Sequence, residues 1–220
     1  MDSSTTRLRR PASPPPADPF SPFGADWFRN LEATERRCRD YVEALRWPGG
    51  VSCPRCRSLA VTRLEARKRL HCRPCRYHFS LTSGTLFHGS HLPLWKWLLA
   101  VFLMLDSDEG LPANQLAEIL GVTYRTAWFV EHRIRAAMGG GPCRHVTGVD
   151  GVEAMTGSVR LFERSLVGCY HQLSVKHLPA YVAESEWRAR NRANPRGFRD
   201  TVLAMVAGDP LSYSQLTRTA

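Results

Sequence analysis

The chain has 220 residues, enough for one or two domains, and 43% of them are hydrophobic, so a buried core is possible. Its net charge is +10, and only three of the thirty basic residues are lysines. A codon bias would explain the preference for arginine but not the net charge, which favours nucleic acid over a membrane as partner. The longest apolar run, Trp97 to Leu105, is too short to span a bilayer, and the polar, Pro-rich start is unlike a secretory signal.

The first 80 residues divide into a tail and a folded unit. Residues 1–24 are rich in Ser, Thr and Pro, and we expect disorder because their few apolar residues cannot offset the entropy of ordering. Residues 25–46 are predicted to form a helix that ends before Pro48-Gly49-Gly50. Alternating residues between 51 and 80 suit short strands. Residues 25–80 are therefore predicted to combine a helix with a small β-unit.

Two Cys-x-x-Cys pairs lie in this unit, with fifteen residues between the inner cysteines: Cys53, Cys56, Cys72 and Cys75. Their spacing is typical of a zinc ribbon, in which four thiolates surround one ion as a tetrahedron. Paired cysteines in a reducing compartment are more often metal ligands than disulfides. Four protein ligands leave no open position for water, so the predicted zinc is structural and not catalytic.

Basic side chains are concentrated around these cysteines. Between Arg46 and Ser80 nine residues are basic and only Glu65 is acidic. Some of these arginines could merely neutralise the thiolates, but nine exceed that need, so we favour contact with phosphates. Arg67 and Arg69 are the candidate DNA contacts in this segment.

Residues 91–138 are predicted to be helical, with helices from Pro93 to about 105 and from about 112 to 120. Gly121-Val122 is a tight turn, and Thr123 is a good N-cap for a helix that continues to about Met138. Two helices joined by a short turn are typical of a helix-turn-helix, although an ordinary hairpin with a solvated basic face gives the same pattern.

The third of these helices has two predicted faces. Helical spacing places Ala127, Val130, Ile134 and Ala137 together on a packing face. The residues predicted to point away from it, as candidates for the groove or the backbone of DNA, are Arg125, Phe129, His132 and Arg133. His132 could equally contact a phosphate or pack, and Phe129 could pack against the helix that contains Leu98.

The last third of the chain begins with a short, Gly-rich stretch, residues 139–160. Residues 161–220 contain a further helical region, whose apolar positions include Leu178, Phe198 and Val202. The predicted fold class is therefore mainly α with a small β zinc ribbon, a helix-turn-helix region and C-terminal helices.

Several segments together resemble one family, the zinc-ribbon insertion-sequence transposases of bacteria. They are CPRC, CRPC, YHFSLTSGTLFHGSHLPLWKW, LAEILGVTYRTAWFVEHRIRAAM and, in the tail, RLFERSLVGCYHQLSVKHLPAYVAESEWRARN. The resemblance covers roughly residues 35–138 and 160–215. It implies a DDE transposase that binds terminal inverted repeats through its ribbon and helix-turn-helix. It also implies a ribonuclease-H-like domain that uses two divalent metals to cut and rejoin DNA.

The chain departs from that family pattern between the helix-turn-helix and the tail. Only about two dozen residues lie there, whereas the catalytic domain needs on the order of a hundred. Asp150 could be the vestige of the first catalytic Asp, but Thr156 stands where the third catalytic residue is expected, with Glu153 nearby. We therefore expect residues 139–160 to be a truncated linker in place of a largely absent catalytic core, so that Mg²⁺ or Mn²⁺ has no site.

The function expected from the sequence is that of a catalytically inactive, transposase-derived DNA-binding protein, without catalytic residues of its own. Its expected partners are double-stranded inverted repeats and, in an oligomer, itself or a full-length transposase. Its expected location is the cytoplasm, at the nucleoid. Two alternatives stay open: a regulator or repressor of related transposases, and a zinc-ribbon module that binds protein or RNA. Residues 161–220, as a remnant of the transposase domain, could lack a surface to cover them or could pack on the helix-turn-helix.

Overall fold

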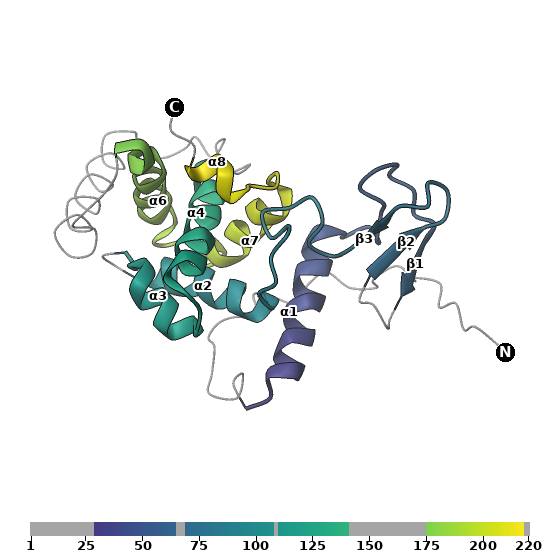
Figure 1. Cartoon of the computed structure of the whole chain (residues 1–220), viewed down its shortest axis with the longest axis horizontal. Helices are drawn as coiled ribbons and strands as arrows, with labels where there is room; N and C mark the ends of the chain where they lie inside the picture. The colour runs from purple at the N-terminus through teal and green to yellow at the C-terminus, as the bar shows by residue number, and fades with distance from the viewer. Residues whose placement is uncertain (1–28, 65–68, 108–109, 141–174, 218–220) are drawn as a thin grey trace.

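The computed structural model describes residues 29–64, 69–107, 110–140 and 175–217. Several predictions fall outside these residues: the disordered tail 1–24, the DNA contact Arg67, the linker from residue 141 to residue 160, and the first part of the C-terminal remnant. Figure 1 shows the β-ribbon at one end of the molecule, the long first helix beside it and the remaining helices gathered at the other end.

The first helix, α1 (Leu31–Arg46), confirms the helix predicted in this region over its described residues. Asn30 caps it, because its Oδ1 accepts a hydrogen bond from the backbone N–H of Ala33 at 3.0 Å. One face of the helix is buried and includes the thiol of Cys38, which has no exposed surface. Burial, and then the charge of Glu35, raise the pKa of Cys38 to about 12.

Three short antiparallel strands form the ribbon: β1 (Val61–Leu64), β2 (Arg69–Cys72) and β3 (His78–Phe79), in the order β1-β2-β3. Their buried side chains face α1, and the ring of Trp47 at the end of α1 meets Phe79 edge-on, with 6.2 Å between centroids. The ribbon and α1 are therefore packed as one unit.

Two arginines fix this packing. The guanidinium of Arg46 donates to the carbonyls of Leu81 and Ser83, and Arg63 of β1 forms an ion pair with Glu43 of α1. Burial lowers the pKa of Arg46 to about 10, which leaves it protonated at neutral pH. Both arginines thus serve the fold of this unit.

The three helices predicted between residues 91 and 138 are confirmed, with ends within two residues of those expected. They are α2 (Leu94–Asp106), α3 (Ala113–Leu120) and α4 (Tyr124–Gly140). Gly121 ends α3 in the left-handed region with φ of 59°, which glycine adopts without strain. Thr123 begins α4 as predicted, since its Oγ1 accepts from the N–H of Thr126 at 3.3 Å.

The C-terminal segment is helical and packs on the rest of the molecule. Its helix α6 (Leu178–Asn191) lies on α4, and α7 (Gly197–Ala207) lies against α1, α2 and α4. A short 3-10 turn, η4 (Val175–His177), precedes them, and α8 (Tyr213–Thr217) follows. Trp187, Val202 and Met205 are all buried in these contacts. Of the two alternatives for the tail, packing on the preceding helices is therefore the one observed.

A buried charge network joins α4 to α6. Arg135, with no exposed side-chain surface, donates to Glu131 at 3.0 Å and to Glu184 at 2.6 Å, and Arg188 lies 3.6 Å from Glu184. Burial raises the pKa of Glu131 to about 7, against the opposing attraction of Arg135. The network fixes α6 on α4 through specific partners as well as apolar contact.

One buried core joins the ribbon, α1 and the helices α2, α3, α4, α6 and α7. It runs from Val61 and Phe79 in the ribbon, through Val42 in α1, to Trp97 and Met205 among the helices. Among the described residues, none of the helices has the length and apolar character needed to cross a bilayer.

Candidate functional site

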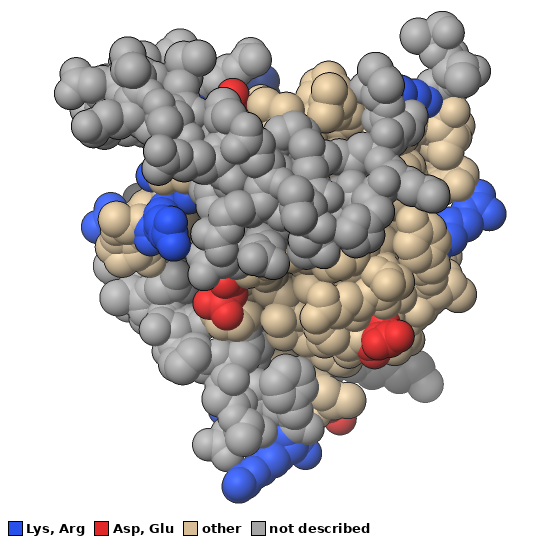
Figure 2. Space-filling view, turned by 90° about the vertical axis from the view of Figure 1, so that its left-hand side faces the viewer, with Lys and Arg blue, Asp and Glu red and all other residues tan. Residues whose placement is uncertain are grey.

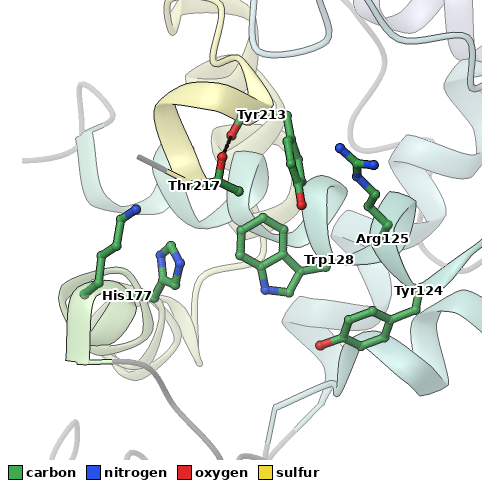
Figure 3. A pocket seen from close by; sticks show the side chains of 7 residues that line it. Tyr124, Arg125, Trp128, His177, Tyr213 and Thr217 are labelled. Carbon is green, nitrogen blue, oxygen red and sulfur yellow. Dashed lines mark hydrogen bonds between the residues drawn. The ribbon is translucent and has the colours of Figure 1, made fainter. Parts of the chain in front are cut away.

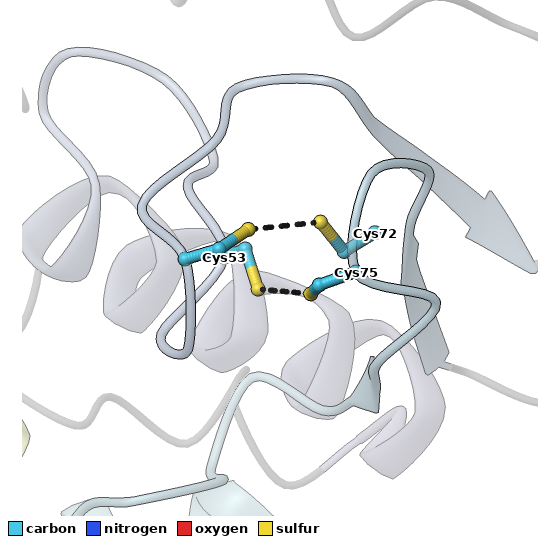
Figure 4. A group of neighbouring side chains, drawn as sticks. Cys53, Cys72 and Cys75 are labelled. Carbon is cyan, nitrogen blue, oxygen red and sulfur yellow. Dashed lines mark hydrogen bonds between the residues drawn. The ribbon is translucent and has the colours of Figure 1, made fainter.

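The four cysteines of the two Cys-x-x-Cys pairs converge at the base of the ribbon (Figure 4). Their Sγ atoms all lie within 4.8 Å of one another, with 3.6 Å between Cys53 and Cys75 and 3.4 Å between Cys56 and Cys72. All four are free thiols. Four Zn–S bonds of about 2.3 Å in a tetrahedron separate the sulfurs by about 3.8 Å. The cluster therefore fits a structural zinc, as the sequence predicted.

Each Cys-x-x-Cys pair sits in a tight backbone turn that aims both sulfurs inward. In the first turn the N–H of Arg57 donates to the carbonyl of Cys53 at 2.8 Å. The residue after the second cysteine has a left-handed backbone in both turns: Arg57 has φ of 59° and Arg76 has φ of 56°. This conformation costs a side-chain-bearing residue roughly 1–2 kcal/mol relative to glycine. Two arginines therefore occupy the positions best suited to glycine.

The basic residues of the ribbon divide into two groups. Arg46 and Arg63 are engaged with the fold, as described above. The others in the described part of the segment have exposed side chains, and they are Arg55, Arg57, Arg69, Arg73 and Arg76. The predicted contact Arg69 lies at the start of β2 and is exposed. The ribbon thus carries five exposed guanidinium groups near a cysteine cluster that contains no Asp or Glu.

Two of the four candidates on α4 lie near the surface. Arg125, in the first turn, is exposed, and its guanidinium lies over the ring of Tyr213 at 4.1 Å. Phe129 is half-buried, between the guanidinium of Arg133 at 4.2 Å and the ring of Tyr213 at 6.0 Å. Arg125 is therefore accessible, and Phe129 mainly packs.

His132 and Arg133, predicted to lie away from the packing face and to be candidates for contact with DNA, are both buried. His132 is 2% exposed, and its ring contacts Trp128 and His177, with centroids 4.1 and 4.6 Å away. Burial, and then the charge of Arg135, lower the pKa of His132 to about 3.

Arg133 is 4% exposed and donates to the carbonyls of Leu211, Leu86 and His88 at 2.8–2.9 Å. Both side chains are buried because α6, α7 and the loop near residue 86 cover the second face of α4. Neither side chain can reach DNA without disrupting these contacts.

A cavity of about 490 Å³ opens at the first turn of α4 (Figure 3). Three segments far apart in the sequence meet there: α4, η4 and α8. Its main lining side chains are aromatic or basic: Tyr124, Arg125, Trp128, Lys176, His177 and Tyr213. Burial, and then the charge of Lys176, lower the pKa of His177. Apart from Arg125, none of these residues was predicted from the sequence, because no pattern in the chain places η4 and α8 beside α4 to form a cavity.

Figure 2 shows the side of the molecule that carries α3 and α6. Among the described residues visible there, Lys and Arg side chains stand apart at the margins, with acidic side chains between them. The basic side chains visible on this side therefore do not form a continuous patch.

Comparisons with known proteins agree with the metal site. Residues 33–78, from within α1 to β3, match a family model described as the transposase zinc-ribbon domain. The match begins inside α1, which the structure shows packed on the ribbon. No solved structure matches the chain.

A relative from Halobacterium salinarum, described as a protein in transposable element ISH50, is 33% identical over 98 residues. The alignment covers 43% of this chain, and the chain spans only 33% of that relative's length. Together the two matches support a relation to transposases, and residues 33–78 are similar to a transposase zinc-ribbon domain.

Proposed function

We propose that this protein binds double-stranded DNA at the terminal inverted repeats of an insertion sequence, through its zinc ribbon and through α3 and α4 acting as a helix-turn-helix. The observation that carries the proposal is the four-cysteine cluster surrounded by exposed arginines, in a domain that matches transposase zinc ribbons. Zinc would hold the two turns together, because each contributes two of its four ligands.

The exposed arginines supply the affinity for phosphates. Arg55 and Arg57 come from the first turn, Arg73 and Arg76 from the second, and Arg69 from β2. Each phosphate that such a side chain neutralises releases counterions, which favours binding at low salt. These contacts position the protein on DNA without reading sequence.

Recognition of the DNA base sequence is assigned to α4, which follows α3 after the turn at Gly121. Of the four residues predicted there, Arg125 is exposed and keeps the role of a base or phosphate contact. His132 and Arg133 are excluded from it by their burial. Specificity would then come from the first turn of α4, as in other helix-turn-helix proteins.

DNA binding is tested by selecting duplexes from a random pool with the zinc-loaded protein and measuring their affinity by fluorescence anisotropy. The variant Arg55→Gln/Arg69→Gln should bind about ten-fold or more weakly, because two phosphate contacts are lost. The control Arg190→Gln removes an exposed arginine of α6, distant from the ribbon, and should bind as wild type. Equal loss in both variants would contradict the assignment to the ribbon.

We propose further that the protein is catalytically inactive, since too few residues separate α4 from the tail for a ribonuclease-H-like domain. Incubation of supercoiled plasmid carrying the selected sequence with protein and Mg²⁺ or Mn²⁺ should give no nicked product. Nicking that increases with time and protein concentration would contradict this part of the proposal.

A further inference from the structure

The cavity at the first turn of α4 has the chemistry of a nucleotide site. We propose that it binds a single unpaired nucleotide of a DNA strand, with the base among the aromatic rings and the phosphate beside Arg125 and Lys176. The proposal rests on the DNA binding proposed above and adds a second element of recognition to it.

The aromatic side chains can contact a planar ring from more than one side. Trp128 lies at the centre of the cavity, and the rings of Tyr213 and His177 stand nearly perpendicular to it, with centroids 6.0 and 5.3 Å away (Figure 3). Tyr124 is 61% exposed at the rim. The volume of about 490 Å³ lies within the range of about 300–1,000 Å³ usual for small-ligand sites. A base can therefore stack here as it does on other aromatic platforms.

The charges in the cavity select an anion. Arg125 and Lys176 are cationic, and no carboxylate is among the described residues that line the cavity. The guanidinium of Arg125 is already held over Tyr213 at 4.1 Å, so little side-chain freedom is lost when it meets a phosphate. A cationic ligand would be repelled, and a neutral apolar ligand would gain nothing from the two positive charges. A ligand that is both planar and anionic satisfies the rings and the cations together.

The position of the cavity favours a nucleotide within DNA. Tyr124 and Arg125 belong to the first turn of α4, the part of the helix assigned to DNA, and they are also part of the cavity wall. A base paired within a duplex cannot reach Trp128 unless it leaves the stack, which costs a few kcal/mol. The site should therefore prefer DNA with an unpaired or easily extruded base.

The wall opposite α4 is suited to receiving such a base. It is formed by α8, a five-residue helix in which no residue is buried. Tyr213 of α8 contacts Arg125, Trp128 and Phe129, so its ring is the main contact between α8 and α4. A substitution at Tyr213 should therefore alter the cavity while leaving the core of the protein intact.

The test compares two selected duplexes that differ only in one unpaired 2-aminopurine nucleotide, with binding followed by anisotropy and by 2-aminopurine fluorescence. Wild type should bind the duplex with the unpaired base about ten-fold more tightly and quench its emission, since stacking on an aromatic side chain is worth about 1–3 kcal/mol. Trp128→Leu should lose both effects and keep its affinity for the paired duplex.

Further variants test the cavity independently, in case Trp128→Leu does not fold. Tyr124→Ala and Tyr213→Ala alter side chains that are not buried, and each should reduce the preference for the unpaired base. Leu31→Ala, which removes an exposed apolar side chain from α1, should leave the preference unchanged. A third arm titrates a free deoxynucleoside monophosphate into the protein.

The outcomes separate this proposal from the proposed function. Equal affinity for the two duplexes, with unquenched emission, overturns the nucleotide site while leaving DNA binding in place. Trp128-dependent binding of the free nucleotide, without a preference for the unpaired base in DNA, overturns the assignment to a DNA strand. Absence of binding to either duplex overturns both proposals.

Discussion

Two arginines at the ribbon turns combine an unfavourable backbone with an exposed charge. Arg57 and Arg76 have φ of 59° and 56°, values that glycine adopts at little cost. Strained residues of this kind tend to occur where function constrains the side chain. We therefore attribute their presence to phosphate contact and not to the stability of the ribbon.

Replacing both with glycine should separate stability from binding. The variant Arg57→Gly/Arg76→Gly should be as stable as wild type or more stable by up to about 1 kcal/mol per site, because relief of strain exceeds the added entropy of the unfolded chain. Its affinity for DNA should fall. Chemical denaturation and anisotropy measure the two effects.

Arg55→Gly is the matched control, since it removes an exposed charge from the first turn at a residue that is not among those with positive φ. It should weaken DNA binding without any gain in stability. If the unfolding free energy of Arg57→Gly/Arg76→Gly is no higher than that of Arg55→Gly, the strain argument is contradicted.

His132 makes the stability of the protein sensitive to acid. Its pKa is about 3 in the folded protein and about 6.5 when unfolded, so the unfolded chain binds more protons between these values. Stability from this group is therefore complete above pH 6.5 and is lost as pH falls, by about 2 kcal/mol at pH 5. The groups that face it are Arg135 on α4, His177 on η4 and Tyr181 on α6.

Glu131 acts in the opposite direction, because its folded pKa of about 7 lies above its unfolded value and its protonation stabilises the fold as pH falls from 7. The effect of His132 is therefore isolated by comparing two proteins. The change in unfolding free energy from pH 7 to pH 5 is measured in wild type and in His132→Gln, and the two changes are subtracted. Wild type should lose about 2 kcal/mol more than the variant over this range. Identical changes in the two proteins would contradict the burial of a neutral His132.

At the scale of elements, the contact between α4 and α6 depends on buried charges. Arg135→Met leaves Glu131 and Glu184 buried without their shared cation, and should destabilise the protein by about 3–5 kcal/mol. Arg190→Met removes an exposed partner of Glu186 on α6 and should cost less than about 1 kcal/mol. Thermal and urea unfolding measure both variants.

A rescue variant identifies the cause of that loss. Glu184 still has Arg188 3.6 Å away, so Glu131 is the carboxylate left without a cation. Adding Glu131→Gln to Arg135→Met removes that carboxylate, so part of the lost stability should return. If the second substitution destabilises the protein further, the network acts through packing and not through charge.

The elements were predictable where their determinants are local. The cysteine spacing identified the metal site, Thr123 identified the start of α4, and Gly121 the end of α3, because each depends on residues adjacent in the chain. The burial of His132 and Arg133 was not predictable, since it depends on His177 and on residues 86–88 and 211, all more than forty residues away in the chain. A helical pattern shows one packing face, and α4 has two.

At the scale of the whole molecule, the ribbon, α1 and the helices share one core. The sequence left open whether the C-terminal segment has a surface to pack on, because apolar residues in a helix do not name their partner. Val202 and Met205 of α7 pack into that core beside α1, α2 and α4. The aromatic cavity arises from the same packing, which explains why no single stretch of sequence indicated it.

We propose that zinc builds a DNA-binding surface from the two cysteine turns. The most direct measurement is the salt dependence of affinity for the selected duplex, with zinc-loaded protein, after removal of zinc by a chelator, and after its return. The zinc-loaded and restored proteins should show a slope of log K against log salt of about −4.5, as five arginines would give, and the zinc-free protein should not bind specifically. Unchanged affinity without zinc, or a slope near zero with it, would contradict the account.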